Sequence, residues 1–142
     1  MLRRDLIVRM IQDMARVLAR LLGLRAKGLL PEAVAEVEVA TKGLLGLDLR
    51  LVEVLDPAVL ATQLGDPDRI AVLARLAQAR GELAGDAGDP AAAASWSLKA
   101  VELWLEAGAA GATLDDEALR AIAAFPPDAL GARQRQLRAA LG

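Results

Sequence analysis

The dipeptide Asp-Pro occurs three times in the chain, and each copy has the form of a helix start. The three copies are Asp56-Pro57, Asp66-Pro67 and Asp89-Pro90. An aspartate just before a helix accepts hydrogen bonds from unpaired backbone N–H groups, and a proline in the first turn loses nothing through its missing N–H. A chain that repeats this signal at short intervals is built as a series of helices joined by tight connections.

The residue usage agrees with a wholly helical chain. Alanine and leucine supply 31 and 27 of the 142 residues, and both are strong helix formers. Aromatic residues make up only 2% of the chain, whereas sheets favour aromatic and β-branched residues. We therefore predict a single all-α domain over residues 1–142 with about seven or eight helices. The predicted helices are 3–25, 31–45, 48–55, 57–64, 67–85, 90–109, 114–125 and 129–141.

Two further starts are assigned from other signals. Thr113 and Asp116 have the spacing of a capping box, which places the start of a helix at 114. Pro126-Pro127-Asp128 combines a helix stop with a new cap, so the last helix is expected from 129.

The residue types that are missing exclude most enzyme chemistry. The chain has no cysteine, no histidine and no tyrosine, which removes the thiolate nucleophile, the imidazole base and the common ligands of zinc and other transition metals. Asp115-Asp116-Glu117 groups three carboxylates, and we interpret it as the negatively charged first turn of a helix. We expect a protein that is not an enzyme, with no cofactor and no metal site.

Charge and hydropathy limit the kinds of partner. The net charge is -2, which argues against a general nucleic-acid binder. The longest uncharged runs, such as Pro57–Gly65, are far shorter than the roughly 20 apolar residues that span a bilayer. We expect a cytoplasmic protein that binds neither nucleic acid nor membrane.

The first predicted helix, 3–25, has an unusually wide apolar face. Its apolar residues between Leu6 and Leu22 fall in an arc of about 160°, whereas one hairpin partner requires about 100°. The excess predicts a homodimer with Met10, Met14 and Leu18 in the contact. The alternative is that the C-terminal helix covers this face.

The polar side of the same helix supports a second alternative. The helix and its turn carry seven basic residues against Asp5 and Asp13, which is typical of a helix that lies on anionic lipid or on nucleic acid phosphate. The basic residues are Arg3, Arg4, Arg9, Arg16, Arg20, Arg25 and Lys27. The interspersed aspartates and the absence of Trp and Phe favour an ordinary solvated face.

An internal repeat carries a resemblance to a known helical unit. The frame Gly28-x4-Ala33-x6-Ala40 recurs as Gly88-x4-Ala93-x6-Ala100, and Gly81 adds a small position in the first helix of the second copy. The frame resembles the tetratricopeptide hairpin. Over residues 1–55 and 70–107, the order of segments is similar to an uncharacterised bacterial domain-of-unknown-function family with such hairpins. The copies lie 60 residues apart rather than about 34, so segments 48–55 and 57–64 are inserted between them.

The resemblance implies a fold and no reaction, and it places a few residues where a partner would bind. In such hairpins Arg75, Gln78 and Glu82 point into the concave side, where helical repeats bind partners. Trp104 is a candidate anchor for a partner, with core packing as the alternative. We expect a non-enzymatic protein–protein interaction or scaffold protein that self-associates and binds a protein or peptide.

Overall fold

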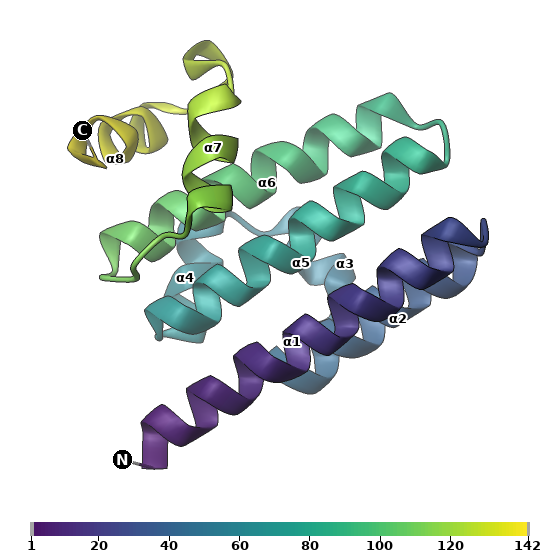
Figure 1. Cartoon of the computed structure of the whole chain (residues 1–142). Helices are drawn as coiled ribbons and strands as arrows, with labels where there is room; N and C mark the ends of the chain where they lie inside the picture. Colours follow the sequence, from purple (N-terminus) through teal and green to yellow (C-terminus); the bar gives the residue numbers. More distant parts are fainter. Residues whose placement is uncertain (1, 142) are drawn as a thin grey trace.

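The computed structural model describes residues 2–141, which contain eight α-helices, one 3₁₀ turn and no strand (Figure 1). The predicted all-α class and the helix count are confirmed. The elements are α1 (Leu2–Ala26), α2 (Leu30–Leu45), α3 (Leu49–Val54), α4 (Pro57–Leu64), α5 (Pro67–Asp86), α6 (Pro90–Ala109), α7 (Asp116–Ala124), η1 (Pro127–Ala129) and α8 (Ala132–Leu141).

Aspartate caps set most of the helix starts, and three of them are the Asp-Pro starts that the sequence predicts. Five helices begin after an aspartate whose carboxylate accepts a backbone N–H, and these caps are Asp48, Asp56, Asp66, Asp89 and Asp115. The cap at Asp48 also confirms that the short segment α3 is a helix.

Two predicted starts are wrong. The capping box at Thr113 does not form, because the Asp115 carboxylate accepts the N–H of Ala118 at 2.8 Å and α7 starts at Asp116. An ionised acceptor binds an N–H more strongly than a hydroxyl does. The last helix starts at Ala132 rather than at 129, because Leu130 adopts an extended backbone after the 3₁₀ turn.

The two copies of the repeat form the same turn. Gly28 and Gly88 have φ values of 71° and 79°, a region that residues with a Cβ rarely adopt. In both turns the glycine N–H donates to the carbonyl three residues earlier, and the next N–H donates to the carbonyl five residues earlier, at 2.9–3.0 Å. Gly111, with φ 110°, ends α6 with the same pair of hydrogen bonds. The repeat found in the sequence does not include this third turn of the same kind.

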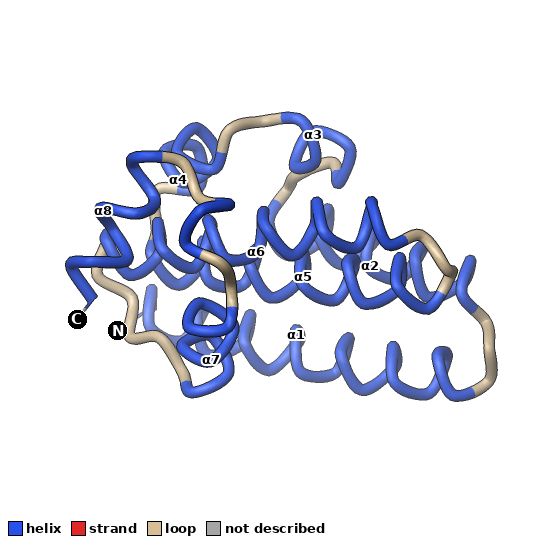
Figure 2. Tube along the Cα trace, turned by 90° about the horizontal axis from the view of Figure 1, so that it is seen from above, coloured by secondary structure: helices blue, strands red, loops and turns tan. Residues whose placement is uncertain are grey.

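The α5–α6 hairpin is the centre of the packing. The α1–α2 hairpin packs on α5, α4 packs on both α5 and α6, and α7 and α8 pack on α6. Seen from above, α1 and α7 lie on one side of the α5–α6 pair, with α3 and α4 on the other (Figure 2). The prediction that the C-terminal helix could cover α1 is wrong, because α8 packs on α6 instead.

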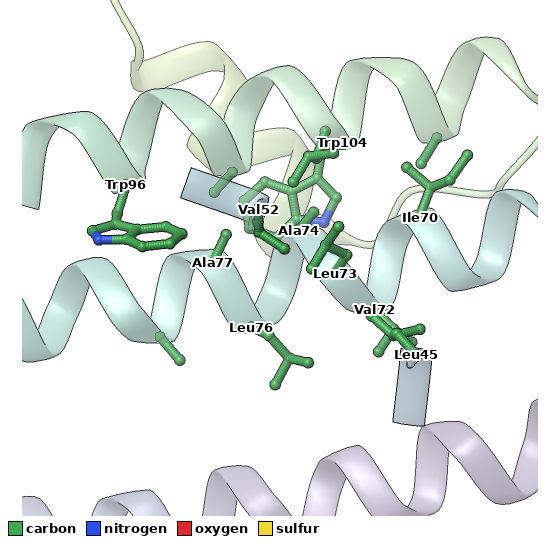
Figure 3. Packing of buried hydrophobic residues seen from close by; sticks show 14 of the residues in the cluster. Leu45, Val52, Ile70, Val72, Leu73, Ala74, Leu76, Ala77, Trp96 and Trp104 are labelled. Atoms are coloured by element: carbon green, nitrogen blue, oxygen red, sulfur yellow. The ribbon is translucent and has the colours of Figure 1, made fainter. Parts of the chain in front are cut away.

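Both tryptophans belong to the core between α5 and α6. Trp96 and Trp104 are each 4% exposed, and both reach from α6 toward α5 (Figure 3). Ala74 and Ala77 of α5 are fully buried beside them. Small residues on one helix thus make room for large aromatic residues on the other, which is how close-packed interiors are filled.

Among residues 2–141, no helix combines the length and the hydropathy that crossing a bilayer requires.

Candidate functional site

A groove runs along α5 between α1 and α7. Its wider part, about 180 Å³, has Ile11 and Met14 on the α1 side and Leu114 and Ala118 on the α7 side. A narrower part of about 80 Å³ continues between α1 and α5 beside Leu18 and Leu22. Arg75 lines both parts, so the two parts lie next to each other along α5. We call this surface the α1–α5 groove.

Helix periodicity explains why α1 supplies an apolar wall. Ile11, Met14, Leu18 and Leu22 follow one another at steps of three or four residues, which stacks their side chains on one side of the helix. Met14 and Leu18 are half-buried, whereas Ile11 and Leu22 remain 44% and 66% exposed. The wall is thus completed by large apolar side chains that face solvent.

Trp104 lines the floor of the groove and does not protrude from it. The side chain touches the groove between α1 and α7 although the residue is only 4% exposed. Of the two interpretations that the sequence leaves open for Trp104, core packing agrees with its burial, and one edge of the residue faces the groove. Such a floor offers apolar contact to a bound side chain.

Of the three predicted polar residues, Arg75 and Glu82 line the groove and Gln78 accepts a hydrogen bond from Arg75, but the two charged side chains are already paired. The Nη1 of Arg75 donates to Oε1 of Glu117 on α7 at 2.5 Å, and it also donates to Gln78. Glu82 accepts from Nη1 of Arg25 at 2.7 Å. The charges of Arg75 and Glu82 therefore bind helices of this chain together, which argues against a role of these two charges in binding a partner.

Arg25 also holds a second carboxylate. Its Nε donates to Asp86 at 2.6 Å, and this hydrogen bond lowers the pKa of Asp86 and raises the pKa of Arg25. One guanidinium therefore faces the two carboxylates of Glu82 and Asp86. These contacts tie the end of α1 to the end of α5.

The predicted self-association residues divide between two environments. Met10 is only 8% exposed and belongs to the core with Val17 and Leu21. It is therefore unavailable to a second copy, and this part of the prediction is corrected. Met14 and Leu18 are half-buried and line the groove. The α2 and α5 helices thus cover only part of the wide apolar arc.

An exposed row of residues on α1 was missed by the sequence interpretation. Val8, Ile11, Ala15, Ala19 and Leu22 are all exposed, and we call them the outer stripe of α1. Their spacing of three or four residues is visible in the sequence and is typical of a helix–helix contact. The signal was missed because the apolar arc was taken as one face and its alanines were not included.

The basic side of α1 is largely neutralised by carboxylates. Arg16 pairs with Asp13 at 2.6 Å, and Arg20 pairs with Glu36 of α2 at 2.5 Å. Arg3 pairs with Asp66 at the start of α5. Because these guanidinium groups are already paired with carboxylates of the chain, they contribute little to a surface for phosphate groups.

A second polar cluster fixes α8 on α6. Glu106 is 4% exposed and accepts from Nε and Nη2 of Arg133 at 2.8 and 2.7 Å, and from Nε2 of Gln134 at 2.8 Å. The hydrogen bond from Arg133 is the main reason that the pKa of Glu106 lies below its ordinary value. One turn earlier, burial raises the pKa of Glu102. With Glu106 fully paired, the cluster is a structural contact.

Comparison with known proteins finds no matching family model, no matching curated protein and no matching solved structure. Among residues 2–141, no three acidic side chains gather closely enough to hold a metal ion.

Proposed function

We propose that this chain is a non-enzymatic protein-interaction domain that binds an apolar segment of a protein partner along the α1–α5 groove. The observation that carries the proposal is the exposed wall of the groove, where Ile11 and Leu22 stand 44% and 66% exposed beside an apolar floor. Soluble chains rarely leave a continuous apolar surface open unless something binds it.

The groove favours a partner segment with a stripe of apolar side chains and a basic residue beside it. Asp68 and Asp115 line the part of the groove between α1 and α7, and the positive charge of Arg75 is already used by Glu117. A helix that lays one apolar face into such a groove is a common mode of peptide recognition.

A tetratricopeptide-like arrangement of the two hairpins is part of this proposal. The shared turn at Gly28 and Gly88 supports it, and so does the position of the groove on α1 and α5, the first helix of each hairpin. Helical repeats bind partners on the concave surface of such helices. A cytoplasmic bacterial scaffold protein that self-associates is the role that we propose for the chain.

Membrane or nucleic-acid binding through α1 is the alternative, and the ion pairs of α1 argue against it. Arg3, Arg16, Arg20 and Arg25 each pair with a carboxylate. Phosphate-driven binding is steeply salt-dependent. We expect no salt-dependent retention on anionic vesicles or on duplex DNA at low and at physiological salt.

A peptide library tests the groove directly. Random 16-residue peptides displayed on phage are selected on the immobilised full chain, and the enriched peptides are then measured against two variants. Ala71→Arg places a long charged side chain in the groove, whereas Ala94→Arg makes the same change on an exposed position of α6. Circular dichroism checks that both variants remain helical.

We expect enriched peptides with apolar residues at steps of three or four. They should bind Ala94→Arg as well as the original chain and should bind Ala71→Arg at least tenfold more weakly. A selection with no enriched sequence pattern, or equal binding to both variants, would overturn the proposal.

A further inference from the structure

We infer that a second copy of this chain docks on the outer stripe of α1, so that two α1 helices form an antiparallel pair about a two-fold axis at Ala15. This inference rests on the proposed interaction role of α1 and names one partner for it. It replaces the contact predicted from the sequence, whose residue Met10 is buried within the chain.

The outer stripe is long, apolar and exposed. Val8, Ile11 and Leu22 are 46%, 44% and 66% exposed, and Ala15 and Ala19 between them are exposed as well. On a helical wheel at about 100° per residue these five residues occupy one arc, and Arg4 at its end is the charged residue on that arc. The stripe is therefore a second apolar face, separate from the face that α2 and α5 cover.

The order of large and small residues along the stripe is self-complementary. An antiparallel two-fold pair centred on Ala15 places Val8 opposite Leu22 of the second copy. It also places Ile11 opposite Ala19 of that copy. Two alanines then meet at the centre, where crossing helices come closest, and the larger side chains fill the ends, where the helices diverge. A two-fold contact requires this match of one surface with itself.

The helix dipoles favour the antiparallel direction. In a parallel pair Arg4 would meet Arg4 of the second copy, and the two helix dipoles would point the same way. In the antiparallel pair Arg4 lies opposite Ala26 of the second copy, and the two dipoles oppose each other.

The composition of the stripe fits a helix better than it fits a lipid surface. Its centre is formed by Ala15 and Ala19, which let a second backbone approach closely but would bury little area in a bilayer. Helices that lie on membranes carry Trp, Phe or Leu on the apolar face and Lys or Arg on the polar face. Four of the six arginines of α1 pair with carboxylates of this chain.

The chain has no cysteine, so single cysteines report the geometry without background. In an antiparallel pair centred on Ala15, the Ala15→Cys chain forms a disulfide with itself under mild oxidation. Val8→Cys does not, because the two copies of position 8 lie about 20 Å apart along the helix axis. The same holds for Leu22→Cys alone. A mixture of Val8→Cys and Leu22→Cys chains forms the mixed disulfide.

Light scattering provides the second measurement. We expect the original chain to have twice the 14.9 kDa chain mass at high micromolar concentration. Ala15→Glu should reduce the mass to one chain, whereas Ala35→Glu, on an exposed position of α2, should leave it unchanged. The cysteine experiment stands independently if Ala15→Glu fails to fold.

Three results would overturn the inference: a mass of one chain throughout the concentration range, self-linking of Val8→Cys, or a dimer unaffected by Ala15→Glu. The proposed function has a separate readout. Selected peptides that bind the groove of a monomeric chain would leave the interaction role standing and refute the second copy as its partner.

Discussion

A Cβ atom placed on Gly81 of α5 would lie 3.0 Å from the Cβ of Trp96 on α6. It would also lie 3.4 Å from the carbonyl oxygen of Ala93. Both neighbours are fixed to the α6 backbone, so neither can move aside without shifting the helix. The missing side chain at Gly81 is therefore what allows the closest approach within the α5–α6 hairpin, and it is the small position that the repeat predicts.

We expect Gly81→Ala to lower the free energy of unfolding by about 1 kcal/mol, because the overpacking cost outweighs the gain in helix propensity. Gly85→Ala, one turn later on α5, is the matched control. Its added Cβ would meet its nearest neighbour at 4.0 Å, so the same change should stabilise the chain by about 0.5–1 kcal/mol. Urea unfolding measures the change in the free energy of unfolding of each variant, and the two changes should have opposite signs. Equal changes would contradict this account of the hairpin.

Ala100 provides a second test of the same contact. It is 1% exposed on α6, and Ala100→Leu should overpack its surroundings at a cost of about 1–3 kcal/mol. Ala94→Leu adds the same atoms at an exposed position of the same helix and should change little. If the melting temperature of Ala100→Leu matches that of the original chain, the alignment of the two repeat copies is wrong.

The anchor of α8 should be sensitive to acid. The pKa of Glu106 is lowered in the folded chain by its hydrogen bonds to Arg133 and Gln134, so its ionised form stabilises the fold at neutral pH. This contribution is lost as the pH falls through the folded-state pKa. We expect Glu106→Gln to cost about 1.5–3 kcal/mol at pH 7, the range for hydrogen bonds to charged groups. The cost should shrink at about pH 3, and an undiminished cost there would contradict the assignment.

Glu102 should behave in the opposite way. Burial raises its pKa in the folded chain above the ordinary value of 4.5, so the fold binds its proton more tightly than the unfolded chain does. Stability is then lost as the pH rises above that ordinary value. We expect Glu102→Gln to raise the free energy of unfolding at pH 7 by roughly 0.5 kcal/mol, after allowing for solvent screening, and to have no effect near pH 3. Glu38→Gln, on an exposed position, is the control, and it should leave the free energy of unfolding unchanged at both pH values.

Local signals in the sequence fix where the helices begin and how the hairpins turn. The caps at Asp56, Asp66 and Asp89 and the turns at Gly28 and Gly88 depend on residues within five positions, so they can be predicted. The last two helix starts were misplaced for separate reasons. The Asp115 carboxylate caps α7 in place of the Thr113 hydroxyl, and the extended backbone at Leu130 delays the start of α8 to Ala132.

The candidate site depends on contacts that a helical wheel does not contain. Periodicity identifies the apolar arc of α1, but the positions of α2 and α5 decide that Met10 is buried and Ile11 is exposed. The partner of Arg75 is Glu117, 42 residues later on a helix that the repeat does not include. The sequence therefore indicated the groove side of α5 and missed the wall that α7 provides.

The ion pair between Arg75 and Glu117 should hold that wall in place while adding little to global stability. The side chains are 24% and 44% exposed, and partly exposed pairs contribute about 0.2–1 kcal/mol. Because the pair is a polar contact between α5 and α7, Arg75→Ala should speed amide exchange in Asp116–Ala124 several-fold and leave α1 and α2 unchanged.

Arg16→Ala is the matched control for this last prediction, since Arg16 pairs with Asp13 on its own helix and its loss should leave α7 unaffected. Glu117→Gln should speed exchange in α7 as Arg75→Ala does, and the double variant should add nothing further, because both changes remove one interaction. Hydrogen exchange followed by mass spectrometry measures all four chains. If amide exchange in α7 is unaltered in the Arg75→Ala chain, the contacts of α7 with α6 are sufficient to hold α7 in place. Ala118 and Ile122 are the buried residues of α7 in the core.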